Sequence, residues 1–280
     1  MYGSVTTPDD LLLLLHRFQA LTIFQIVRLI RKETSINNVR SKLKRLVDNG
    51  FVETQYLPRT TPSGSTPMMY SLSSKGTKYI QGTGGVAAGI GQKTRGVLPL
   101  QHLLEINDVL ISSLLLPTVA PEISVLEFVH ERIYKQNPIC ITQGSYLCPD
   151  GFTHFVLSPP FGKPDEPMGI IWEVDRNTED AFIIREKIRD YCKLFYGDCE
   201  QIFGTTVLCV VFVVTLGGNP RVKQLRRAAE LELDKSHDDG ELFLFGAHPP
   251  AEIAPLQFFT SPVWIQPFQS SPVSLIESRS

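Results

Sequence analysis

The chain has 280 residues, of which 42% are hydrophobic and 20% charged, as is ordinary for a soluble globular protein with a substantial core. Its five cysteines include no C-x-x-C pair, which excludes a disulfide framework and a zinc-finger spacing and indicates a reducing cytoplasm. The apolar run from Val207 to Val214 suits a buried strand but is too short to span a membrane, so no membrane partner is expected.

Charge is divided unevenly along the chain, although the formal net charge is only −2. Residues 1–80 contain eleven Lys/Arg and five Asp/Glu, which gives a net charge of +6. Residues 81–280 contain sixteen Lys/Arg and twenty-four Asp/Glu, which gives a net charge of −8. A basic module therefore precedes an acidic one.

The basic module is expected to begin with helices, because its apolar residues recur with a helical period behind suitable N-cap residues. A Gly at position 50 is a natural C-terminal stop. The predicted helices cover residues 8–18, about 23–31 behind Thr22, and a third segment capped by Thr34 or Ser35 that ends before Gly50.

The third helix is the informative one, because the face opposite its apolar stripe is basic and rich in amides. Asn and Arg can form bidentate hydrogen bonds with base edges, and Lys neutralises phosphates. The plainer interpretation is a solvated basic face. The candidate DNA-binding residues on this helix are Asn37, Asn38, Ser41, Lys44 and Arg45, with Arg40 and Lys42 on its flanks.

A hairpin is expected next, with strands over residues 51–57 and 68–72 joined by the polar tip 59–67. Arg59, in this tip, joins the candidate DNA contacts, and Ser73 to Gly76 open a further turn or short helix. Three helices followed by a hairpin resemble a winged helix-turn-helix domain. That resemblance implies double-stranded DNA as the partner, with a protein partner as the alternative.

Residues 81–99 contain six glycines and few large apolar side chains, but neither a G-x-G-x-x-G nor a Walker sequence. They are predicted to form a flexible linker. The domain limits expected from composition are 1–80 for the winged helix, 81–99 for the linker and 100–280 for the acidic domain.

The acidic domain shows the alternation of a mixed α/β fold, in which helices flank a mixed sheet. Its tail is expected to be anchored by Phe258, Phe259 and Trp264 and to fray from Ser270 to Ser280. The predicted elements are a helix over 100–116, strands over 124–130, 151–157 and 168–175, a helix over 178–196, a strand over 205–215, a helix over 220–233 and a strand over 241–246. The helix over 178–196 is expected to be capped by Thr178 and to pack Phe182, Ile183, Ile188, Tyr191 and Phe195 inward.

Two acidic residues of this domain, Asp150 and Glu173, lie at the ends of hydrophobic strands, where carboxylates are costly to bury unless they are paired or bind a cation. The pattern leaves open a metal site and a buried ion-pair network of Glu173, Asp175, Arg176 and Lys187. The histidines His102, His130 and His154 do not cluster in sequence and are interpreted as structural residues.

The element order and these carboxylates resemble the PD-(D/E)xK nuclease superfamily, which implies a restriction-endonuclease-like domain. The resemblance assigns metal binding to Asp150 and Glu173, with Glu105 and Asp175 as further ligands of Mg²⁺ or Mn²⁺. Asp175 stands where that superfamily has its lysine, and Lys187 on the following helix is the candidate for a displaced catalytic lysine.

The whole arrangement resembles the replication-relaxation family, most specifically in the run Trp172 to Glu179, read as W-E-V-D-R-N-T-E. The resemblance implies a cytoplasmic DNA-binding accessory protein of a plasmid or other mobile element, acting in replication control or maintenance. Its nuclease-like domain would be non-catalytic, with mobile-element replication or transfer proteins, or a second copy of the chain, as partners. The alternative is a Mg²⁺-dependent DNA endonuclease.

Overall fold

The computed structural model describes residues 7–30, 35–57, 68–83, 97–142, 144–197, 199–234 and 238–278. The chain forms two compact units, residues 1–111 and 112–280, and each is described by itself. This division falls inside helix α5 (Val97–Leu115), whereas the limits predicted from composition lie at 81 and 99. Residues 84–96 of the predicted linker lie outside the described residues.

The helices of the first unit begin at the N-cap residues that its sequence provides. Thr7 and Thr22 each form a capping box, and the Ser35 hydroxyl accepts a hydrogen bond from the Asn38 backbone N–H. Thr34, the alternative cap, lies outside the described residues. The predicted helices are thereby confirmed as α1 (Pro8–Phe18), α2 (Ile23–Leu29) and α3 (Ile36–Asp48), and α4 (Ser74–Gly82) follows the hairpin.

The sheet of the first unit is antiparallel, with strand order β1-β3-β2. Both predicted hairpin strands are present as β2 (Val52–Tyr56) and β3 (Met68–Leu72), in a register that pairs Val52 with Leu72. The short strand β1 (Ala20–Thr22) was not predicted. The predicted tip, including Arg59, lies outside the described residues.

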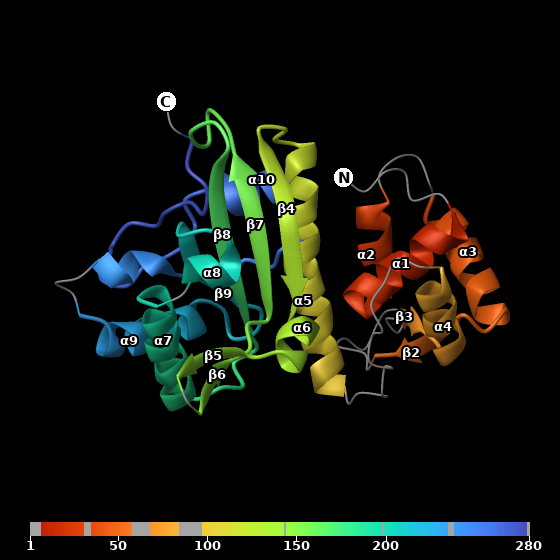
Figure 1. Cartoon of the computed structure of the whole chain (residues 1–280), viewed down its shortest axis with the longest axis horizontal. Helices are drawn as coiled ribbons and strands as arrows, with labels where there is room; N and C mark the ends of the chain where they lie inside the picture. Colours follow the sequence, from red (N-terminus) through yellow and green to blue (C-terminus); the bar gives the residue numbers. More distant parts are fainter. Residues whose placement is uncertain are drawn as a thin grey trace. The chain divides into compact units, whose positions relative to one another are not determined.

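Helix α4 packs against the turn that ends α3 (Figure 1). Ser73 Oγ donates to the Gly50 carbonyl at 2.6 Å, and Lys75 Nζ donates to the Asn49 carbonyl at 2.9 Å. A Cβ at Gly76 would lie 2.1 Å from the Phe51 carbonyl oxygen, so only glycine permits this approach. The C-terminal end of α3 is therefore fixed by α4.

The first turns of α5 belong to the first unit. The Asn107 side-chain amide donates to the Phe18 and Ala20 carbonyls at 3.1 and 2.7 Å, and Arg28 forms a 2.7 Å ion pair with Asp108. The sequence predicted this helix, from residue 100, as the first element of the acidic domain. In the structure, however, Asn107 of this helix satisfies backbone carbonyls between α1 and α2, and Asp108 binds a side chain of α2.

The second unit is built on a five-stranded mixed sheet, as predicted, with strand order β10-β9-β8-β7-β4. The strands β4, β7 and β8 are antiparallel neighbours, and β8, β9 and β10 are parallel (Figure 1). All seven residues of β9 are buried, as expected for an internal strand. The strands are β4 (Ile123–His130), β7 (Gly151–Leu157), β8 (Glu166–Asp175), β9 (Leu208–Val214) and β10 (Phe243–Gly246).

Helices cover both faces of this sheet. The helices α7 (Ala181–Phe195) and α9 (Gly218–Glu232) share one hydrophobic core with the face that carries Ile171 and Phe212. On the other face, Trp172 contacts the rings of α10 (Pro255–Thr260). Short elements that were not predicted complete the unit: η1 (Leu116–Thr118), α6 (Glu131–Gln136), β5 (Ile139–Thr142), β6 (Ser145–Leu147), α8 (Cys199–Phe203) and η2 (Asp238–Leu242).

Two predictions for α7 were wrong. Its N-cap is Asp180 rather than Thr178, because the Asp180 carboxylate accepts hydrogen bonds from the backbone N–H groups of residues 182 and 183. Phe182 and Ile183 do not pack inward but are 64% and 41% exposed. Ile188 and Tyr191 are buried and Phe195 packs on the core, as predicted, and the stripe begins at Ile184.

The tail is anchored by Phe258, Phe259 and Trp264, all fully buried as predicted. The expectation that it frays from residue 270 was wrong for the described part. Trp264 pairs with Val273, and Ile276 is 1% exposed and donates its N–H to the Phe259 carbonyl. Among the described residues, no helix has the length and apolar character needed to cross a membrane.

Candidate functional sites

Asp150 and Glu173 meet where β7 begins beside β8. The antiparallel register pairs Gly151 with Trp172. Asp150, which precedes Gly151, therefore lies next to Glu173, which follows Trp172. Two hydrogen bonds fix this junction: Asp150 N–H donates to the Trp172 carbonyl at 3.1 Å, and Val174 N–H donates to Asp150 Oδ2 at 2.7 Å. Both carboxylates are buried, with 8% and 3% exposure.

Helix α7 supplies two partners to Glu173. Lys187 Nζ lies 2.9 Å from Glu173 Oε2, and the Tyr191 hydroxyl donates to Oε1 at 2.5 Å. Their spacing of four residues places both on one face of the helix. Lys187 Nζ also lies 2.9 Å from Glu179 Oε1, so one ammonium group bridges two carboxylates. The structure thus brings Asp150, Glu173 and Lys187 into one cluster.

Burial dominates the electrostatics of this cluster. The pKa of Glu173 is raised from 4.5 to about 7: removal from water is the main cause and the nearby charge of Asp150 adds to it, whereas Lys187 and Tyr191 act in the opposite direction. The pKa of Lys187 is raised, because the attraction of its carboxylate neighbours outweighs the loss of hydration. Glu173 and its neighbours therefore titrate as a group.

Asp175 belongs to a separate interaction on α9. Arg221 Nε and Nη2 each lie 2.8 Å from one Asp175 oxygen, which forms a two-pronged contact between buried side chains. The same guanidinium donates to the Glu179 carbonyl at 2.7 Å. The ion-pair interpretation of the sequence named Arg176 for such a contact, whereas the structure uses Arg221. The carboxylate of Asp175 is thus committed to an internal ion pair with Arg221.

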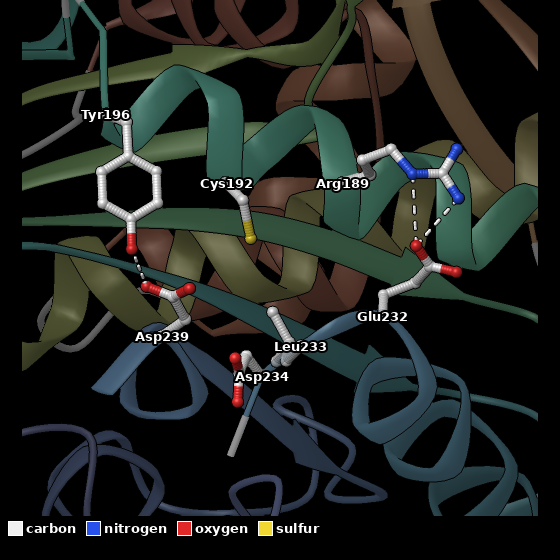
Figure 2. A pocket seen from close by; sticks show the side chains of 7 residues that line it. All are labelled: Arg189, Cys192, Tyr196, Glu232, Leu233, Asp234 and Asp239. Atoms are coloured by element: carbon white, nitrogen blue, oxygen red, sulfur yellow. Dashed lines mark hydrogen bonds and ion pairs between the residues drawn. The ribbon is translucent and has the colours of Figure 1, made fainter. Parts of the chain in front are cut away.

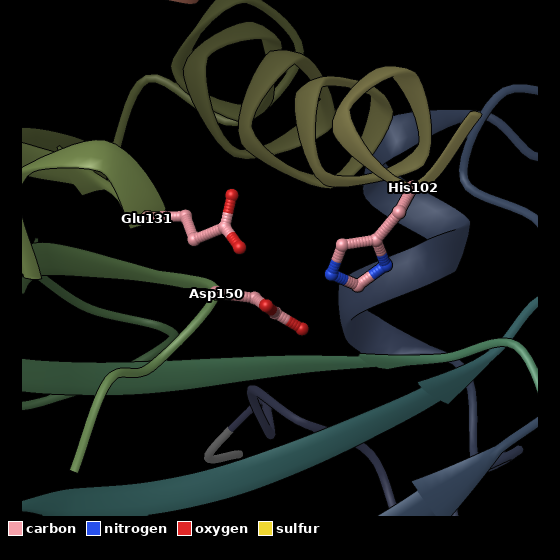
Figure 3. Close-up of side chains that lie close together, drawn as sticks. All are labelled: His102, Glu131 and Asp150. Carbon is pink, nitrogen blue, oxygen red and sulfur yellow. The ribbon is translucent and has the colours of Figure 1, made fainter. Parts of the chain in front are cut away.

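Glu131, at the start of α6, adds a carboxylate to the cluster that the sequence did not single out. Its backbone N–H donates to the Asp150 carbonyl at 2.9 Å, and a carboxylate oxygen of each residue lies within 4.8 Å of the other. Lys135, one turn later, forms an ion pair with Glu131. Figure 3 shows these two carboxylates, which lie close together.

The outer face of α3 is exposed over its whole length. Val39, Leu43 and Leu46 are buried, and the candidate DNA-binding residues occupy the opposite face. Arg40 Nη1 donates to Asn37 Oδ1 at 3.0 Å. The exposed members are Asn37, Asn38, Arg40, Ser41, Lys44 and Arg45, while Lys42 is partly buried and Arg59 lies outside the described residues.

Glu105, the fourth candidate metal ligand, is partly buried on α5 in the first unit. It lies one turn before Asp108, where its charge contributes to a raised pKa of about 6 for the Asp108 carboxyl. Burial is the main cause of that shift, and Arg28 opposes it.

A cavity of about 420 Å³ lies between α7 and the end of α9 (Figure 2). Its carboxylates are largely engaged by the protein, since Glu232 pairs with Arg189 and Arg185, and Asp239 accepts a hydrogen bond from the Tyr196 hydroxyl. Burial raises the pKa of the Cys192 thiol to about 12, so this sulfur is a poor nucleophile.

Sequence reasoning missed Tyr191, Glu131 and Arg221 as partners of the carboxylates. Tyr191 could have been found, because it follows Lys187 by one helical turn and therefore faces the same strand. Arg221 lies 46 residues from Asp175, and no local pattern joins two residues so far apart in sequence.

Comparison with known proteins finds one family match. The family model described as replication-relaxation matches residues 12–206, which include the α3 surface and the cluster of Asp150, Glu173 and Lys187. Searches of the curated proteins and of the solved structures find no match.

Proposed function

The chain belongs to the replication-relaxation family, and we propose that it is a DNA-binding accessory protein in replication control or maintenance of a plasmid or other mobile element. In this proposal the first unit is a winged helix that binds double-stranded DNA through α3. The family match supports the link with replication, and the surface of α3 supports the link with DNA.

The observation that carries the proposal is the exposed face of α3. A helix of this diameter fits the major groove, where amide and guanidinium groups can contact base edges. The element order α1-β1-α2-α3-β2-β3 and the antiparallel strand order β1-β3-β2 support the winged-helix proposal. Lys44 and Arg45, in the second half of α3, are positioned to neutralise phosphates.

Fluorescence anisotropy with a labelled duplex tests this proposal. Binding is expected to weaken steeply with salt, and Arg45→Ala is expected to reduce the slope of log affinity against log salt by about one. Arg227→Ala, at a 69% exposed side chain of α9, is the matched control and should leave binding unchanged. Absence of duplex binding at low salt, or equal behaviour of the two variants, would contradict the proposal.

We further propose that the second unit is a non-catalytic scaffold, which binds mobile-element replication or transfer proteins or a second copy of the chain. The supporting observation is that Glu173 already has both oxygens engaged, one by Lys187 and one by Tyr191. The aspartate at position 175, engaged by Arg221, provides no positive charge for a scissile phosphate.

A Mg²⁺- or Mn²⁺-dependent DNA endonuclease is the second candidate, and the contact of Lys187 with Glu173 is the observation that favours it. Carboxylates on adjacent strands are the oxygen ligands that these cations prefer, so Asp150 and Glu173 fit the ion. Bound there, the metal would supply Lewis-acid stabilisation of a phosphate. Lys187 would hold the attacking water or developing charge, and Tyr191 would orient Glu173.

Incubation of supercoiled plasmid with the protein and Mg²⁺ or Mn²⁺ separates the two candidates. An endonuclease would nick the plasmid, and Asp150→Ala and Lys187→Met would abolish nicking while Lys193→Met, at an exposed side chain of the same helix, would not. Absence of nicking leaves the scaffold proposal standing. Nicking that persists in Asp150→Ala identifies a contaminant.

A further inference from the structure

The first turn of α3 carries an arginine whose guanidinium is held by a neighbouring amide. Arg40 Nη1 donates to Asn37 Oδ1 at 3.0 Å, and both side chains are exposed. The backbone beneath them is fixed, because the Ser35 hydroxyl caps the N–H of residue 38 and Val39 is 1% exposed in the core. An exposed arginine with such support has fewer conformations to lose on binding.

Arg40 lies on a flank of α3, about 100° around the helix axis from the buried Val39. Asn37 and Lys44 lie further toward the side of the helix opposite Val39, at 100° per residue. The Arg40 side chain is exposed, and its hydrogen bond to Asn37 holds the guanidinium toward that outer face.

The chemistry of the pair suits a base edge better than a phosphate. The bond to Asn37 uses one of the five N–H donors of the guanidinium, and a guanidinium fork matches the O6 and N7 acceptors of guanine. Residues in the first turns of a recognition helix are those that contact bases. The lysine and arginine at positions 44 and 45, about one turn after Arg40, supply the charge for the phosphates.

We propose that Arg40, positioned by Asn37, recognises a guanine in the major groove of duplex DNA and sets the sequence preference of the protein. This inference rests on the proposed DNA-binding function and adds the base that is read. Asn37 is a positioning residue here, since it acts through the arginine.

Selection from a random duplex library, followed by anisotropy on the selected duplex, tests the inference. Replacing the recognised G·C pair by A·T should weaken wild-type binding roughly 5- to 150-fold. Arg40→Lys keeps the charge but replaces the planar fork by a single ammonium group, so the preference for the G·C duplex should shrink while the affinity for the A·T duplex stays close to that of the wild type. Asn37→Ala should reduce the preference while leaving the salt dependence unchanged. Arg227→Lys, the same substitution on α9, is the control and should behave as wild type.

The outcomes distinguish this inference from the function on which it rests. If the wild type binds no duplex at low salt, the DNA-binding proposal itself fails. If it binds duplex without any sequence preference, or if Arg40→Lys keeps the guanine preference, only the inference is overturned. If Arg40→Lys weakened binding to both duplexes by the same factor, the arginine would contact a phosphate, and the inference would also be overturned. Far-ultraviolet circular dichroism and a melting curve establish that each variant is folded.

Discussion

Opposing effects act on the single side chain of Glu173. Its place in β8, within the sheet, removes it from water and raises the pKa of its carboxyl, and the charge of Asp150 adds to this effect. Lys187 and Tyr191 compensate by direct contacts to its two oxygens. These contacts fix α7 on the sheet.

The stability of the protein should therefore depend on pH through Glu173. Its folded pKa of about 7 lies above the ordinary value of 4.5, so the native state holds more protons between these values and this contribution to stability is lost as pH rises. Relative to Glu173→Gln, the free energy of unfolding of the wild type should fall between pH 4.5 and 7. Urea titrations across this range measure it. Glu179→Gln, which alters an exposed contact of the same lysine, is the control. A difference that is constant with pH would contradict the prediction.

The buried ion pair of Asp175 and Arg221 should contribute more to the free energy of unfolding than an exposed ion pair does. Arg221→Met should lower the free energy of unfolding by about 3–5 kcal/mol, because it leaves a buried carboxylate without its ion-pair partner. Arg227→Met, on the same helix but 69% exposed, should change it by no more than about 0.5 kcal/mol. Chemical denaturation measures both. Similar effects in the two variants would show that the Arg221 contact contributes little.

At the scale of the element, α7 shows how a helical periodicity can be correct while the start of its buried stripe is wrong. Phe182, Ile183 and Ile184 are consecutive apolar residues, and more than one of them can begin a helical stripe. The structure buries Ile184 and exposes the first two. Lys187 lies beside the sheet, as its expected contact with Glu173 requires.

The N-terminal end of α7 provides the matching prediction. Asp180→Ala should lower the free energy of unfolding by about 0.5–2 kcal/mol, because two backbone N–H groups lose their acceptor. Thr178→Ala, at the exposed position that the sequence suggested as the cap, should have little effect. Thermal and urea unfolding of both variants tests this, and a larger effect at position 178 would contradict it.

At the scale of the whole molecule, the two compact units divide the helix α5 between them. Composition places the change from basic to acidic charge near residue 80, whereas compactness continues the first unit to residue 111. The second unit is closed by its own tail, which returns to the sheet where Ile265 pairs with Phe245 of β10. Leu275 and Ile276 of this tail are thus part of its core.

Removal of residues 273–280 should destabilise the second unit. The deletion removes the buried side chains of Leu275 and Ile276, which are only 6% and 1% exposed. It should therefore lower the free energy of unfolding by roughly 3 kcal/mol or more. The melting temperature measures this change. Removal of residues 277–280 alone is the control and should leave it nearly unchanged. Equal melting temperatures of the two shortened chains would show that the tail is dispensable.

The sequence by itself determined the long elements and their chemistry. The predicted α1, α3, β3, β7 and β9 arise from periodicity and local capping, which are properties of neighbouring residues. The same local signals placed basic groups on the outer face of α3 and carboxylates at Asp150 and Glu173. Short elements such as α6 and β5 were not predicted, because a segment of only a few residues shows too little helical or strand periodicity to be recognised.

Only the tertiary structure decided which groups meet. Arg221 reaches Asp175 across 46 residues, and Glu131 lies beside Asp150 because the chain turns at the edge of the sheet. The inward face of α7 and the closure of the tail depend likewise on surfaces formed by distant strands. Such contacts arise from packing, which sums interactions between residues remote in sequence, and a single sequence records no signal of that pairing.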